Sequence, residues 1–240
     1  MILELSDIHK FYKQGDKKIN VLNGLNFKID QGEKFSIIGR SGSGKSTIVD
    51  LIAGLLKPSK GYIEIDGKRL PDDRIREWQN NFSIVTQTPF MFNNTLYENI
   101  TLGHKRKSIN VKELIRKIEL SNLIKKRKFK LKDELSDKGQ NVSGGERQRI
   151  AIARSLYFDA DIIIFDEATN ALDEVTEKKI IKNINRLREK KTIIIITHRA
   201  KTLKFCDNIY LIKDGKIKTS GKFNQLKKRS KYFRDLLGQD

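Results

Sequence analysis

The stretch GRSGSGKST, residues 39–47, decides the fold. Its spacing matches G-x-x-x-x-G-K-[ST], in which the glycines let backbone N–H groups wrap a chain of phosphates. The apolar run FSIIG (35–39) precedes it, and the helical pattern STIVDLIAGLL (46–56) follows it. A strand, a glycine loop and a helix in this order favour a phosphate-binding loop over a plain glycine-rich turn. In such a loop Lys45 lies between the β- and γ-phosphates, and the Ser46 hydroxyl binds Mg²⁺.

Three other strand-length runs end in polar residues. They are FSIVTQ (82–87), DIIIFDE (161–167) and TIIIIITH (192–198). Runs that are apolar on both faces are typical of parallel strands covered by helices on both sides. Helical patterns lie between them, and they are found at 110–120, from 143 onward and at 174–190. The sequence therefore predicts an α/β fold with a parallel central sheet.

The polar residues at these strand ends suggest chemistry, because ligands bind at the carboxyl ends of strands in open parallel sheets. Asp166 ends a buried strand with a carboxylate, and Mg²⁺ is the expected partner. Glu167 could orient or deprotonate a water molecule. His198 would contact a γ-phosphate. The alternative is that both acids cap the next helix and that the histidine is an ordinary polar residue.

A second anion-binding helix start is predicted at SGGERQR, residues 143–149. Ser143 and Glu146 have the spacing of a capping box ahead of an apolar helical pattern. Gly144 and Gly145 leave the backbone bare at that point, where free N–H groups and the helix dipole favour an anion. One small domain thus contains two cradles for phosphate.

The composition describes a globular chain with a large basic excess. It has 240 residues, 38% hydrophobic and 33% charged, and a formal charge of +19. No run approaches the roughly 18–20 apolar residues of a membrane span. Lone Cys206 excludes an internal disulfide and a cysteine zinc cluster, which fits a reducing compartment. The charge favours a solvated surface over proximity to an anionic membrane leaflet, and nucleic acid is not expected as a partner.

Taken together, these motifs resemble the nucleotide-binding domain of ATP-binding cassette (ABC) transporters over about residues 2–235. GRSGSGKST resembles the Walker A loop, VSGGERQR the family signature, and IIIFDE the Walker B strand with its catalytic glutamate. Gln87 matches the Q-loop glutamine, His198 the switch histidine, and NALD (170–173) the D-loop with Asp173. Asn170 replaces the usual serine. Tyr12 resembles the aromatic residue that stacks on adenine, or it is an ordinary hairpin aromatic.

The resemblance implies the ligands and the residues that bind them. ATP and Mg²⁺ are the expected cofactors, with Glu167, His198 and Gln87 as catalytic residues and Ser46, Gln87 and Asp166 at the metal. The nucleotide would contact Tyr12, Gly39, Arg40, Ser41, Gly42, Ser43, Gly44, Lys45, Ser46 and Thr47. A second copy would contribute its signature residues Ser143, Gly144, Gly145 and Glu146. This head-to-tail pairing explains why one domain has two cradles.

The resemblance also implies the domain layout. We expect one ABC nucleotide-binding domain over 1–240, with an antiparallel β subdomain at the N-terminus. Its RecA-like P-loop NTPase core would span about 1–87 and 157–240. An inserted α-helical subdomain would span about 88–156.

The stretches TPFMFNNTLYENI (88–100) and DELSDKGQNVSGG (133–145) resemble the exporter branch of the family. The expected partners are therefore the transmembrane domains of an exporter, on the same full-length polypeptide. The expected location is the cytoplasmic face of the inner or plasma membrane. Two alternatives stay open. One is a soluble ABC ATPase, and the other is a different P-loop enzyme such as a small kinase or GTPase.

Overall fold

The computed structural model describes residues 3–106, 109–121, 124, 128–135, 139–185 and 191–238. The chain forms two compact units, residues 1–82 with 190–240 and residues 83–189. The expected helical subdomain, 88–156, falls within the second unit. Residues 136–138, which belong to the exporter-like stretch 133–145, lie outside the described residues.

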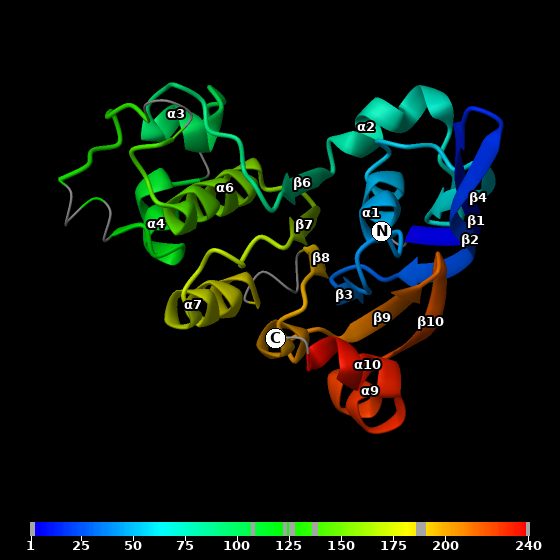
Figure 1. The fold of residues 1–240 in the computed structure, drawn as a ribbon. Coiled ribbons are helices and arrows are strands. Elements are labelled where there is room, and N and C mark those ends of the chain that lie inside the picture. Colours follow the sequence, from blue (N-terminus) through cyan, green and yellow to red (C-terminus); the bar gives the residue numbers. More distant parts are fainter. Residues whose placement is uncertain are drawn as a thin grey trace. The chain divides into compact units, whose positions relative to one another are not determined.

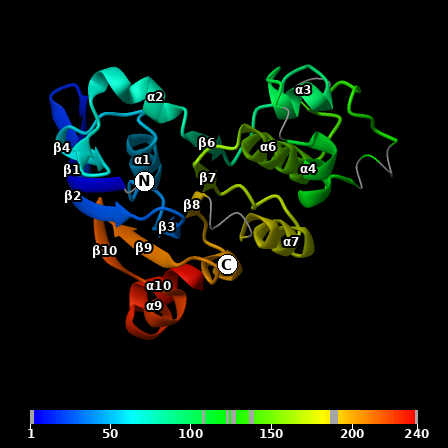
Figure 2. The same ribbon diagram turned by 180° about the vertical axis from the view of Figure 1, so that it is seen from behind.

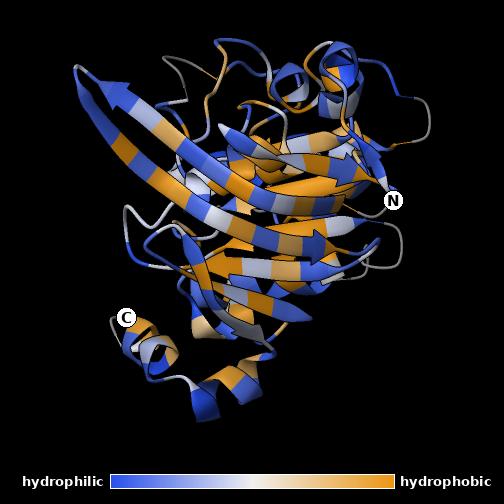
Figure 3. Ribbon diagram, turned by 90° about the vertical axis from the view of Figure 1, so that its right-hand side faces the viewer, coloured by the Kyte–Doolittle hydropathy of each residue, from blue (hydrophilic) through white to orange (hydrophobic). Residues whose placement is uncertain are grey.

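The first unit contains an antiparallel sheet in the order β2-β1-β4-β5. Its strands are β1 (Leu3–Gln14), β2 (Lys17–Ile29), β4 (Lys60–Ile65) and β5 (Lys68–Arg69). Hydrophobic and hydrophilic residues alternate along the long β1–β2 hairpin (Figure 3), as expected when one face of each strand is buried. This is the antiparallel N-terminal region that the family resemblance implied.

The mainly parallel sheet of the first unit is centred on β3 (Lys34–Ile38). It pairs in parallel with β8 (Thr192–Ile196) and with β9 (Asn208–Lys213). All five residues of β3 and of β8 are buried, which confirms the interpretation of apolar runs as strands covered on both faces. β10 (Lys216–Gly221) adds an antiparallel edge strand.

Short helices complete the first unit, and one of them follows the glycine loop. They are α1 (Lys45–Ile52), η1 (Asp72–Arg74), α2 (Ile75–Gln79), α8 (Ala200–Leu203), α9 (Phe223–Arg229) and α10 (Lys231–Leu237). The pattern at 46–56 predicted a longer helix than α1. The helix stops early because Gly54 adopts a left-handed conformation with φ 68° and its N–H donates to the Leu51 carbonyl.

The second unit is mainly helical, and its longest helix is α6 (Gly144–Phe158). Helices α3 (Leu96–Thr101) and α4 (Val111–Lys117) pack on α6, as Figures 1 and 2 show from opposite sides. The unit also contains α7 (Glu174–Asn185) and the neighbouring strands β6 (Phe82–Val85) and β7 (Ile162–Asp166). The helix predicted at 110–120 is shorter, because Glu119 has φ 59°.

Candidate functional site

The glycine loop between β3 and α1 adopts a conformation that requires its glycines. Gly42 has φ 76°, and Gly44, which precedes the first residue of α1, has φ 102°. Side chains rarely tolerate this region of backbone space. A Cβ atom on Gly44 would also lie 2.7 Å from Cδ2 of Leu22, and one on Gly39 would collide with the Ile212 carbonyl oxygen. The loop therefore presents bare backbone, as a phosphate cradle requires.

Lys45 lies across this loop. Its Nζ atom donates hydrogen bonds to the carbonyl oxygens of Gly39, at 2.7 Å, and Arg40, at 3.0 Å. The loop is closed by a hydrogen bond from the Ser43 N–H to the Arg40 carbonyl, at 3.2 Å. One positive charge and the start of α1 thus lie together in one small loop, and this combination favours polyanions. Ser46 and Thr47 follow in the first turn of α1.

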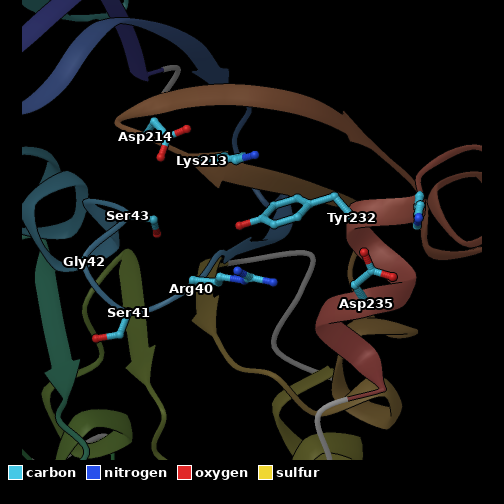
Figure 4. A pocket seen from close by; sticks show the side chains of 9 residues that line it. Arg40, Ser41, Gly42, Ser43, Lys213, Asp214, Tyr232 and Asp235 are labelled. Carbon is cyan, nitrogen blue, oxygen red and sulfur yellow. The ribbon is translucent and has the colours of Figure 1, made fainter.

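Ser43 has a buried hydroxyl that fits the same ligand chemistry. The residue is 7% exposed, and within the described residues its Oγ has no hydrogen-bond partner. Such atoms are rare in native structures and require a reason. Figure 4 shows Arg40, Ser41, Gly42 and Ser43 lining a pocket together with the β9–β10 turn and Tyr232 of α10. A phosphate oxygen would satisfy the Ser43 hydroxyl.

Two other residues that the sequence analysis assigned to the nucleotide site, His198 and Tyr12, belong to the first unit. Because Ile37 of β3 lies opposite Ile196 of β8, the carboxyl ends of the two strands meet at one edge. His198, two residues past the end of β8, is therefore at the same sheet edge as the glycine loop. Tyr12 on β1 is 42% exposed, and Lys10 Nζ lies over its ring, 5.4 Å from the ring centroid.

The predicted acids belong to the second unit, at the end of β7. Asp166 is the last residue of the strand, and Glu167 follows in a left-handed conformation with φ 49°. Glu167 Oε2 accepts a hydrogen bond from Asn170 Nδ2 at 2.9 Å, and the Asn170 N–H donates to the Glu167 carbonyl at 3.1 Å. In the sequence, Asn170 was notable only because it replaces the usual serine of the D-loop. The structure shows that it holds the Glu167 carboxylate.

Asp173 caps helix α7. Its Oδ1 accepts a hydrogen bond from the Thr176 N–H at 3.0 Å, and this bond is the main reason that the pKa of Asp173 is lowered. An aspartate immediately before a helical pattern is a recognised start signal, so the sequence contained this information. Mutation can separate the role of Asp173 as the cap of α7 from the D-loop role that the family resemblance implies for it.

We expect Asp173→Ala to lower the Tm by a few degrees and Asp173→Asn to lower it less, because asparagine also caps helices. The pKa of Asp173 is lower in the folded chain, so the carboxylate stabilises the fold above its ordinary pKa. That contribution is lost as the pH falls through the lowered value. Thermal unfolding of both variants at neutral and acidic pH checks this. Equal losses at every pH would contradict a charged cap.

The predicted capping box at α6 is confirmed. The Glu146 N–H donates to Ser143 Oγ at 3.2 Å, and the Ser143 N–H donates to Glu146 Oε2 at 2.7 Å. The two glycines after Ser143 differ in their surroundings. A Cβ on Gly145 would lie 2.9 Å from the Ala171 carbonyl oxygen, whereas one on Gly144 would find only ordinary contacts, the nearest at 3.8 Å. Packing among the described residues therefore does not require a glycine at position 144.

Gln87 follows β6 in the second unit and is exposed. Its carbonyl accepts a hydrogen bond from Gln148 Nε2 at 3.2 Å. Gln148 lies inside the SGGERQR stretch, but no residue pattern in that stretch indicates its contacts. The second unit thus contains Gln87, Asp166, Glu167, Asp173 and the signature residues, and the first unit contains the glycine loop, Tyr12 and His198.

Among the helices that the structure describes, none has the length and the apolar composition of a membrane span. The family model described as "ABC transporter" matches residues 22–170. An "ATP-dependent lipid A-core flippase" from Neisseria meningitidis serogroup A is 38% identical over 218 residues, which cover 90% of this chain and 35% of that protein. A flippase of the same name from Saccharophagus degradans is 34% identical over 98% of this chain and 40% of that protein.

Among solved structures, "Structure of a bacterial Atm1-family ABC exporter with ATP bound" matches with a TM-score of 0.90 and 29% identity. The match covers 99% of this chain and 42% of the exporter. The chain thus spans well under half the length of these relatives. By its motifs, its fold and these similarities, the chain belongs to the ABC transporter family, as a nucleotide-binding domain of the exporter type.

Proposed function

We propose that this chain binds and hydrolyses MgATP and thereby powers an exporter, with ATP joining two copies head to tail. The observation that carries the proposal is the glycine loop, in which bare backbone, Lys45 and the buried Ser43 hydroxyl converge. The relatives support it, since the flippases are named ATP-dependent and the matched exporter structure has ATP bound.

In the first unit, the loop N–H groups and Lys45 would hold the phosphates. Lys45 Nζ would exchange the Gly39 and Arg40 carbonyls for phosphate oxygens, which are stronger acceptors because they are charged. Tyr12 would stack on the adenine ring with its exposed face. His198, at the same sheet edge as the loop, would hydrogen-bond the γ-phosphate.

The donor set fits Mg²⁺. The ion is usually held by one or two carboxylates together with phosphate oxygens and water. Asp166, which ends β7, and the Ser46 hydroxyl, in the first turn of α1, are each donors of this kind. Ser46, Asp166 and Gln87 would hold Mg²⁺, which when bound neutralises charge on the β- and γ-phosphates.

Glu167 is the proposed base for the attacking water. Its carboxylate is restrained by Asn170, so it is oriented before the water binds. Such preorganisation is the main way in which proteins accelerate phosphoryl transfer, because the chemistry itself requires little from the enzyme beyond positioning and charge.

The signature would serve the nucleotide of the second copy. The capping box occupies the N–H groups of Ser143 and Glu146, and the first helical bond runs from Arg147 to the Ser143 carbonyl. The N–H groups of Gly144 and Gly145 precede that bond and belong to the helix start, where anions bind. Capping and phosphate binding therefore use different atoms.

The exposed aromatic residues Phe90, Phe92 and Tyr97 support docking to transmembrane domains of the same polypeptide, at the cytoplasmic face of a membrane. They are 55%, 46% and 39% exposed. Hydrogen bonds hold the backbone of this segment in place. The Asn99 side chain accepts from the N–H of Phe92 and donates to its carbonyl. Arg154 donates to the carbonyls of Phe90 and Asn99. An apolar surface that is already formed and exposed favours an exporter domain, which docks to a membrane domain, over the alternative of a soluble ABC ATPase.

The test is the dependence of ATPase activity on protein concentration. A cassette that completes its site by pairing should show a specific activity that rises with concentration and then saturates, because only the dimer turns over. Activity per molecule is measured over a wide dilution series with MgATP in excess. A constant specific activity would contradict pairing, and absence of MgATP hydrolysis at any concentration would contradict the proposed function.

A further inference from the structure

The buried side chain of Gln148 joins two separate backbone segments of the second unit. Gln148 lies on α6 and is 2% exposed. Its Nε2 donates to the carbonyl of Gln87 at 3.2 Å, and its Oε1 accepts from the N–H of Ala171 at 3.1 Å. These partners are 61 and 23 residues away in the sequence. Only the NH₂ group can donate and only the oxygen can accept, so this pair of contacts fixes the orientation of the carboxamide.

Both segments lead to groups assigned to the reaction. Gln87 is the residue proposed to contact the metal. Ala171 directly follows Asn170, which donates to the Glu167 carboxylate at 2.9 Å. The first turn of α6 approaches the same segment at a second point, since a Cβ on Gly145 would lie 2.9 Å from the Ala171 carbonyl oxygen. Gln148, on the signature helix α6, thus bonds both to the Gln87 segment and to the Glu167–Asp173 segment.

We propose that Gln148 is a positioning residue for ATP hydrolysis, which fixes the Gln87 segment and the Glu167–Asp173 segment at a set separation on the signature helix. The inference rests on the proposed ATPase function. Leaving a buried amide hydrogen bond unmade costs free energy. Moving either segment away from Gln148 would break such a bond, so both segments are held in place. Small errors in the position of catalytic groups have large effects on rate, about 10² for 1 Å.

The experiment compares Gln148→Met and Gln148→Glu with the control Ser155→Ala. Methionine has a similar volume but neither hydrogen bond, and glutamate keeps only the acceptor for the Ala171 N–H. Ser155 lies two turns along the same face of α6, is 1% exposed and donates only within its own helix, to the Ile152 carbonyl. Steady-state ATPase kinetics and hydrogen exchange of the Ala171 amide are measured on the full chain.

In Gln148→Met we expect kcat to fall by about 10–100-fold while KM for MgATP stays within about twofold, together with loss of protection at the Ala171 amide. Gln148→Glu should keep that protection but lose kcat, because a carboxylate faces the Gln87 carbonyl. Ser155→Ala should match the unmodified chain in kcat, KM and Ala171 protection.

A kcat for Gln148→Met equal to that of Ser155→Ala would overturn the proposal. So would an Ala171 amide that exchanges freely in the unmodified chain, a result that does not depend on either variant folding. Failure of the proposed function gives a different pattern, in which the unmodified chain hydrolyses no MgATP although the Ala171 amide is protected.

Discussion

Glu167→Gln is expected to lower kcat for ATP hydrolysis by about 10²–10³-fold while ATP binding and ATP-driven pairing persist. The amide has the shape of the carboxylate but does not accept a proton at neutral pH. Its Oε1 can still accept the hydrogen bond that Asn170 Nδ2 donates to Glu167, so the local geometry is retained. Under the proposed head-to-tail pairing, hydrolysis separates the two copies, so the ATP-bound dimer of this variant should accumulate.

Three measurements check this prediction, namely ATPase rate, nucleotide affinity, and mass in solution with and without MgATP. Glu64→Gln is the matched control, because it makes the same chemical change on β4, outside the residues assigned to the site. Turnover of Glu167→Gln at the rate of the unmodified chain would show that Glu167 is not the base. Loss of ATP binding together with turnover would place Glu167 in nucleotide binding instead.

The parts of the site that could be predicted are those whose chemistry is local in sequence. Neighbours within a few residues specify each of these parts. They are the glycine loop, the capping box of Ser143 and Glu146, and the buried strands β3, β7 and β8. Backbone conformation and capping depend on such neighbours, so residue type and spacing are sufficient. Helix ends were less predictable, and α1 stops at the turn around Gly54.

The parts that could not be predicted depend on which distant segments meet in the fold. In the sequence, Gln148 is indistinguishable from any other polar residue of a helix. Its hydrogen-bond partners, Gln87 and Ala171, are 61 and 23 residues away. The Asn170 contact is different, because Glu167 is only three residues away. The left-handed turn at Glu167, with φ 49°, accompanies that contact, and a glutamate gives no signal of such a turn.

The second large effect is expected at the signature. Ser143→Arg should abolish ATP-driven pairing while single-site ATP binding is unchanged, because we propose that the signature serves the nucleotide of the second copy. This substitution also removes a helix cap, since Ser143 Oγ accepts the Glu146 N–H. Gly144→Arg is therefore the cleaner change. A Cβ on Gly144 comes no closer than 3.8 Å to the other described residues, so the substitution causes no clash at the Cβ atom and removes no helix cap.

Light scattering of each variant in the Glu167→Gln background, with and without MgATP, measures pairing, and equilibrium binding of a fluorescent ATP analogue measures the single site. Both arginine variants should bind nucleotide like the unmodified chain and remain monomeric. Asn224→Arg is the matched control, because it adds the same side chain at an exposed position of α9 outside the residues assigned to the site, and it should pair. If arginine at position 144 weakened nucleotide binding as much as pairing, the signature would act on its own chain's nucleotide. The head-to-tail arrangement would then be wrong.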